Sequence, residues 1–185
     1  MKVLLTSCGL ETAKIEKVFM DMLPKEPEEI KAIFVPTAAI YPDAIEVLHK
    51  CLEDLLKCGI KRENIFVYDL HDEIGANIRE SYDVIYFCGG DPRYLLRRIN
   101  EKVFRKDLME FIDDDGVVLG VSAGSIIFAD NIPDNLGLLK CPLDVHCSSE
   151  SREKVGSYSK DRTERIKLGN EQAIVFEQDK MVIFE

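Results

Sequence analysis

Short apolar runs alternate with amphipathic stretches along the first two-thirds of this chain, and this rhythm strongly limits the folds available to it. The runs are rich in Val, Ile and Phe, and Gly, Pro or Asp residues bound them. Near-continuous apolar runs of this length are typical of strands covered on both faces, as in a parallel sheet. The predicted strands are Val3–Thr6, Ala32–Val35, Ile65–Tyr68, Val84–Phe87 and Val117–Val121.

Helical patterns lie between these runs. The clearest extends from Pro42 to Cys58, with Gly59 just past its end. Its apolar face carries Ile45, Leu48, Leu52, Leu55 and Leu56. Further helices are predicted at Glu11–Met22, Asp72–Glu80, Lys102–Ile112 and Ala123–Ala129. Repeated strand–helix–strand units predict a flavodoxin-like three-layer α/β/α sandwich with a mainly parallel sheet and right-handed crossovers.

The alternation of apolar runs and amphipathic stretches ends after Ser122. We expect a long irregular stretch from Asp130 to Lys160, and long loops in compact domains are usually functional or disordered. Two strand-like runs follow, Ala173–Phe176 and Met181–Phe184. They are predicted to pair as a hairpin through Glu177–Lys180.

Length and charge narrow the function classes. A chain of 185 residues predicts one domain, 1–185. It has 24 Lys and Arg against 34 Asp and Glu, and the net charge of −10 argues against nucleic acid and anionic membranes as partners. No run of about 18 apolar residues predicts a membrane span. Only Met1 and Lys2 precede the first predicted strand, and the apolar run that follows is too short for a secretion signal. We therefore expect a cytoplasmic protein.

The six cysteines include no C-x-x-C pair, and in the cytosol they are expected to be free thiols. We expect neither a metal nor a cofactor. The sequence leaves a monomer and a homodimer equally open.

The segment Gly120–Gly124 fits the pattern G-x-S-x-G and sits between a predicted buried strand and a short helix. A sharp strand-to-helix turn needs small neighbours and exposes the serine hydroxyl above the sheet. The pattern also suits a tight packing turn that merely contains Ser122. The strand–turn–helix context favours a nucleophile.

Two further features support acyl-transfer chemistry. Gly89 and Gly90 follow the preceding predicted strand, where glycines let backbone N–H groups approach a ligand, although a plain hinge would use them too. His146 is the only histidine after Ser122, and histidine is the usual base for a serine nucleophile. We therefore expect Ser122 and His146 within about 4 Å of each other.

These residues resemble the peptidase S51 family, which includes aspartyl dipeptidase (peptidase E) and cyanophycinase and has a class I glutamine-amidotransferase-like fold. The likeness covers nearly the whole chain. It is carried by Leu5–Leu10, Phe34–Ala38, Phe87–Asp91, Gly120–Gly124, His146 and Glu150–Glu153.

The resemblance implies a serine-type dipeptidase that cleaves short peptides with an acidic N-terminal residue. Ser122 would be its nucleophile and His146 its base. The backbone N–H groups of Gly90 and Ala123 would form the oxyanion hole, and Arg152 would receive the substrate's side-chain carboxylate.

The third catalytic member stays open among Glu171, Asn170 and Asp130. An asparagine can orient a catalytic histidine, as papain-like proteases show.

Other classes fit less well. An α/β-hydrolase would place its acid and histidine after further strands, and a glutamine amidotransferase would have cysteine at position 122. The main alternative is a catalytically idle relative that binds a small acidic ligand or a partner protein. A serine-directed active-site probe separates that binding protein from an enzyme.

Overall fold

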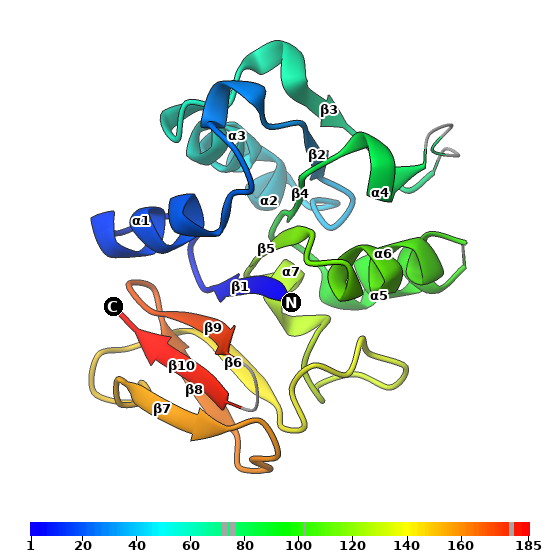
Figure 1. Ribbon diagram of the computed structural model, residues 1–185. Coiled ribbons are helices and arrows are strands. Elements are labelled where there is room, and N and C mark those ends of the chain that lie inside the picture. Colours follow the sequence, from blue (N-terminus) through cyan, green and yellow to red (C-terminus); the bar gives the residue numbers. More distant parts are fainter. Residues whose placement is uncertain (72–73, 75–76, 102, 178–179) are drawn as a thin grey trace.

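The computed structural model describes residues 1–71, 74, 77–101, 103–177 and 180–185 (Figure 1). Its centre is an eight-stranded sheet with the order β3-β2-β4-β5-β1-β9-β10-β7. The parallel part is formed by β1 (Lys2–Thr6), β2 (Ala32–Val35), β3 (Ile65–Val67), β4 (Val84–Phe87) and β5 (Val117–Val121). The predicted α/β fold with a mostly parallel sheet is confirmed.

The central strands β2, β4 and β5 are buried on both faces, and successive residues of a strand point to opposite sides of the sheet. On β1, for example, Val3 and Leu5 join one core and Leu4 joins the other. Helices α1 and α3 contribute to the core that contains Leu4, and α4 to α7 contribute to the opposite one (Figure 1). The result is the three-layer arrangement that the alternating pattern predicts.

Seven helices lie in the described residues, together with the 3₁₀ turns Pro27–Glu29 and Arg62–Asn64. The helices are α1 (Ala13–Met22), α2 (Pro42–Glu46), α3 (Leu48–Lys57), α4 (Ile78–Ser81), α5 (Pro92–Asn100), α6 (Phe104–Asp113) and α7 (Ala123–Ile126).

The single helix predicted over Pro42–Cys58 is wrong. Val47 takes φ −92° and ψ −4°, which interrupts the helix and separates α2 from α3. Of the predicted apolar face, Ile45 on α2 is 53% exposed and Leu56 on α3 is 37% exposed, whereas Leu55 on α3 is fully buried.

Helix α5 was not expected from the sequence, although its start carries a clear signal. Asp91 Oδ1 accepts hydrogen bonds from the N–H groups of Arg93 and Tyr94, both at 2.9 Å, and Pro92 occupies the first helical position. Part of the helix predicted at Asp72–Glu80 and the first residue of Lys102–Ile112 lie outside the described residues. Residues 178–179 of the predicted hairpin connection lie outside them too.

The expected irregular stretch from Asp130 to Lys160 is wrong in part, because it contains two strands. They are β6 (Leu143–Cys147) and β7 (Gly156–Ser159). β7 is an edge strand of sequence Gly-Ser-Tyr-Ser, so it lacks the apolar pattern of a buried strand. β6 pairs in parallel with β8 (Ile166–Gly169) to form a separate two-stranded sheet.

The C-terminal hairpin is present as β9 (Ala173–Glu177) and β10 (Lys180–Phe184), which pair antiparallel. β9 also pairs with β1, so the hairpin extends the sheet beyond its parallel part (Figure 1). Within the described residues, no helix combines the length and apolar character needed to cross a membrane.

Candidate active site

Ser122 occupies a sharp turn between β5 and α7. Its backbone has φ 50° and ψ −109°, a strained conformation for a residue with a side chain. Its N–H group donates to the Thr6 carbonyl oxygen at 3.0 Å, which extends the β1–β5 pairing into the turn. The Ser125 hydroxyl accepts from the Thr6 N–H at 3.0 Å and lies 2.7 Å from the Gly120 carbonyl oxygen. These bonds fix the strained turn against β1.

Close packing explains the second glycine of the G-x-S-x-G pattern. A Cβ atom added to Gly124 would lie 2.7 Å from Phe87 Cβ and would overlap the Phe87 carbonyl oxygen. Backbone cannot move aside as a flexible side chain can. The turn therefore packs directly against the end of β4.

We expect Gly124→Ala to destabilise the protein by about 1–3 kcal/mol, because overpacking at a rigid contact forces the backbone to shift. Thermal unfolding should show a Tm lower by roughly 2–12 °C for a chain of this size. Gly156→Ala is the matched control, since a Cβ there meets atoms no nearer than 3.7 Å. Equal Tm values for the two variants would contradict the close contact at Gly124.

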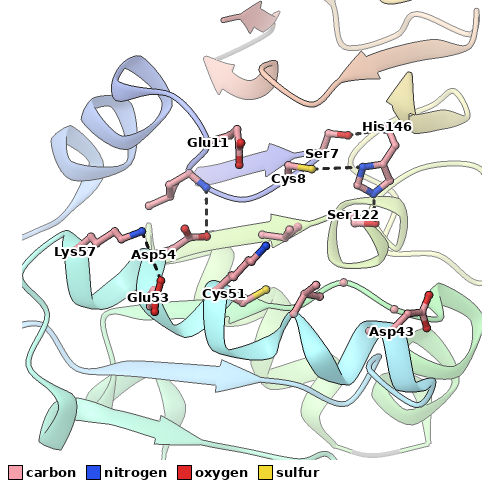
Figure 2. Close-up of a pocket in the computed structure, with 17 residues that line it drawn as sticks. Ser7, Cys8, Glu11, Asp43, Cys51, Glu53, Asp54, Lys57, Ser122 and His146 are labelled. Carbon is pink, nitrogen blue, oxygen red and sulfur yellow. Dashed lines mark hydrogen bonds and ion pairs between the residues drawn. The ribbon is translucent and has the colours of Figure 1, made fainter. Parts of the chain in front are cut away.

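His146 reaches Ser122 from β6. Its Nε2 lies 2.9 Å from Ser122 Oγ (Figure 2). The β6–β8 register shifts between Asp144 and Cys147, and His146 takes φ 58° within this irregularity. A bulge re-aims side chains, which explains how a strand residue points across to the serine. The His146 N–H also donates to Ser7 Oγ at 2.6 Å, which ties the bulge to the end of β1.

Asn170 lies on the other side of the imidazole. Its Oδ1 is 3.0 Å from His146 Nδ1. When Nδ1 carries the hydrogen and donates to this oxygen, Nε2 is left free to accept from Ser122. The Ser7 hydroxyl is 3.4 Å from the same Asn170 oxygen. The three side chains Ser122, His146 and Asn170 thus form a continuous hydrogen-bonded series.

The other proposed third members lie elsewhere. Glu171 is next to Asn170 in sequence, but its carboxylate pairs with Arg152 at 3.6 Å. Asp130 Oδ1 accepts from Asn135 Nδ2 at 3.4 Å. Of the three residues left open by the sequence, Asn170 is the one in contact with His146.

Cys8 also approaches His146, with its Sγ 3.5 Å from Nδ1 (Figure 2). Burial, with a smaller contribution from the nearby Glu11 carboxylate, raises the pKa of the Cys8 thiol. The thiolate is the nucleophilic form of cysteine, so a raised pKa makes Cys8 a poor nucleophile at neutral pH. Cys8 is therefore the weaker of the two candidate nucleophiles beside His146.

A cavity of about 960 Å³ opens beside the Ser122–His146 pair. Its lining carries four carboxylates and two ammonium groups, from Glu11, Asp43, Glu53, Asp54, Lys50 and Lys57. Figure 2 labels these residues except Lys50. Lys57 Nζ lies 3.6 Å from Glu53 Oε2. In the described part of the chain, Lys50 has no carboxylate within 4.0 Å. Lys50 is therefore available to an acidic ligand.

Asp54 is a fixed carboxylate in this cavity. Its Oδ2 accepts from the buried Tyr86 hydroxyl at 2.7 Å and from the Leu10 N–H at 3.3 Å. Burial raises the pKa of Asp54, while the hydrogen bonds from Tyr86 and Leu10 act in the opposite direction. No group of three or more His, Cys, Asp or Glu side chains in the described residues is arranged to hold a metal ion.

Gly90 and Ala123 are the two residues whose N–H groups the resemblance assigns to an oxyanion hole. Gly90 lines the cavity with φ 138°, and a Cβ there would overlap the Ala38 carbonyl oxygen, so only glycine fits. Ala123 directly follows Ser122. Within the described residues, neither N–H group has a backbone acceptor. Of the two residues, Gly90 lines the cavity, whereas Ala123 is 1% exposed.

Arg152 lies outside the residues that line the cavity. Its guanidinium pairs with Glu185 at 2.9 Å and with Glu171 at 3.6 Å. The structure thus places the predicted carboxylate receptor among carboxylates of its own chain.

Sequence reasoning missed the contacts of Ser7 and Cys8 with His146. Both residues follow β1, and they reach the site because β1 pairs with β5, with Thr6 opposite Val121. A signal existed, since ligands of open α/β sheets bind outside the carboxyl ends of the strands. The strand order, in which β1 is the neighbour of β5, cannot be predicted from the local sequence.

Residues 3–183 match peptidase family S51. The chain belongs to this family. The match spans nearly all of the sequence and includes both Ser122 and His146. Among curated proteins, none matches the chain significantly.

Solved structures share the fold of this S51 family member. A candidate peptidase E protein from Listeria monocytogenes EGD-e superposes with a TM-score of 0.77 and 18% identity, covering 100% of this chain and 98% of that one. A peptidase from an acI-B1 Actinobacterium gives a TM-score of 0.65 and 14% identity, covering 98% and 86%. At these identities the likeness concerns the fold alone.

Proposed function

We propose that this S51 family member is a serine peptidase that cleaves short peptides through Ser122 and His146. The observation that carries the proposal is the 2.9 Å contact between Ser122 Oγ and His146 Nε2. A hydroxyl is a weak nucleophile until a neighbouring base removes its proton. The Asn170 contact with Nδ1 supports the imidazole tautomer that such a base needs.

The proposed reaction is acyl transfer. Ser122 Oγ attacks the carbonyl carbon of the scissile peptide bond, and its proton passes to His146 Nε2. The N–H groups of Gly90 and Ala123 stabilise the resulting oxyanion. His146 then protonates the leaving amine as the C–N bond breaks. A water molecule, deprotonated by His146, then attacks the acyl carbon. The bond from that carbon to Ser122 Oγ breaks, His146 returns the proton to Ser122 Oγ, and the product acid is released.

We further propose a preference for peptides with an acidic first residue. Such a peptide carries a free ammonium group and carboxylates together, and the cavity lining offers groups of both signs. Since Arg152 is already paired with two glutamates, Lys50 is the cation that we assign to the side-chain carboxylate. The overall charge of −10 is screened over about 8 Å at physiological salt, so a local cation can still attract an acidic group.

The function is tested with a fluorophosphonate probe and a panel of Asp-X, Glu-X and Ala-X dipeptides. A working serine and oxyanion hole should give covalent labelling at Ser122 and faster hydrolysis of Asp-X than of Ala-X. Absence of both labelling and hydrolysis would instead favour the binding-protein alternative.

Lys50→Ala should lower kcat/KM for Asp-X by roughly tenfold, the equivalent of about 1.4 kcal/mol for one charge-assisted hydrogen bond. The rate with Ala-X should stay within about twofold, because that substrate has no side-chain carboxylate to lose. Lys17→Ala serves as the control, since Lys17 is an exposed residue of α1 that pairs with Asp21. An equal loss for Asp-X and Ala-X would contradict the role assigned to Lys50.

A further inference from the structure

The short turn between β8 and β9 carries Asn170, and its geometry determines where the Asn170 oxygen lies. The Gln172 N–H donates to the Gly169 carbonyl oxygen at 3.1 Å, which closes the turn with Asn170 and Glu171 at its tip. The buried Gln172 side chain accepts from the Gly169 N–H at 3.1 Å. Two hydrogen bonds between Gly169 and Gln172 thus close the base of the turn. Neither of them holds Asn170 or Glu171 at the tip.

Arg152 supports the tip of this turn. Its side chain lies over Gly169, where an added Cβ would be 2.9 Å from Arg152 Cδ. Its guanidinium continues past the turn to Glu171 and Glu185. The stem therefore covers the residue before Asn170, and the charged end holds the residue after it.

The segment that carries Arg152 is itself fixed to the same turn. The Glu153 N–H donates to the Lys167 carbonyl oxygen on β8 at 2.7 Å. Gln172 Nε2 donates to the Glu153 carbonyl oxygen at 2.9 Å. Arg152 is consequently anchored on both sides of the turn, and loss of its side chain would leave the tip with one contact fewer on each side of Asn170.

We propose that Arg152 is a positioning residue that acts through Asn170, holding its oxygen against His146 Nδ1, and that it does not bind substrate. The inference rests on the proposed Ser122–His146 mechanism. If Asn170 moves away from Nδ1, the imidazole loses the partner that keeps Nε2 unprotonated and directed at Ser122. The loss should appear in kcat, because a small misplacement of a catalytic group lowers the reaction rate strongly.

The test compares Arg152→Ala, Asn170→Ala and the double variant on Asp-X and Ala-X. Arg152→Ala should lower kcat by about tenfold on both substrates with KM within about twofold. The double variant should be no slower than Asn170→Ala within about twofold, because two changes in one pathway do not add. Arg152→Lys, which keeps the stem over Gly169, should recover part of the rate. Arg97→Ala, an exposed arginine of α5 paired with Glu101, is the control.

Two kinetic outcomes would overturn the inference. A rise in KM confined to Asp-X would make Arg152 a substrate-binding residue. Rate losses that multiply in the double variant would make it independent of Asn170. Failure of the proposed function is recognised separately, because the wild-type protein would then show no hydrolysis, or hydrolysis would persist in Ser122→Ala.

A readout without turnover completes the experiment. Amide hydrogen exchange at Gln172, whose N–H closes the turn, should speed up in Arg152→Ala and not in Arg97→Ala. Unchanged exchange at Gln172 would show that Arg152 does not hold the turn, whatever the fate of the mechanism.

Discussion

Ser122→Ala should lower kcat/KM for dipeptide hydrolysis by about 10³-fold or more, because loss of the nucleophile leaves only binding and oxyanion stabilisation. The same variant should not react with the fluorophosphonate probe. His146 Nε2 has no other nucleophile at hydrogen-bond distance in the described residues, and Cys8 faces the opposite ring nitrogen. Circular dichroism and Tm measurements would establish that the variant is folded. Retention of more than a tenth of the activity would exclude Ser122 as the nucleophile.

The strain at position 122 provides a matched variant for this test. With φ 50° and ψ −109°, serine and alanine both carry a Cβ in an unfavourable backbone region, whereas glycine does not. Ser122→Gly should therefore be as inactive as Ser122→Ala but more stable by about 1 kcal/mol or more. A variant that is inactive and more stable cannot owe its inactivity to unfolding. The pair separates catalytic loss from structural loss.

The sheet could be predicted from sequence where strands are buried on both faces. Ala32–Val35, Val84–Phe87 and Val117–Val121 occur at the predicted boundaries because continuous apolar runs have few other folded environments. β6 and β7 were missed for the opposite reason. β7 reads Gly-Ser-Tyr-Ser on an edge, and β6 contains Asp144 and His146, so neither shows the apolar signal.

In the candidate site, too, some residues could be predicted from local sequence and others could not. Ser122 could be found because a strained strand-to-helix turn imposes small residues on both sides of it. The partner of His146 could be narrowed to Glu171, Asn170 and Asp130 but not chosen among them, because Asn170 reaches Nδ1 through the β6–β8 pairing and the bulge at His146. Glu171 is the adjacent residue and a stronger orienting group by charge alone. Tertiary pairing with Arg152, rather than residue type, directs it elsewhere.

His146→Asn should lower kcat/KM to nearly the same extent as Ser122→Ala, by about 10³-fold or more, since members of one catalytic unit do not contribute additively. Asparagine is the preferred replacement because His146 has φ 58°, a left-handed conformation that asparagine tolerates better than alanine. The backbone bond from residue 146 to Ser7 Oγ does not depend on the side chain and should persist. The fold at the bulge should therefore survive.

Chemical rescue makes this last test specific to the imidazole. The cavity of about 960 Å³ beside Ser122 has room for a small base, and removal of the His146 ring enlarges it. Added imidazole should restore part of the hydrolysis in His146→Asn, more strongly as pH rises, because only the neutral form accepts the serine proton. Ser122→Ala is the control and should show no rescue. Rescue in both variants would mean that imidazole itself attacks the substrate, and a fully active His146→Asn would exclude His146 as the base.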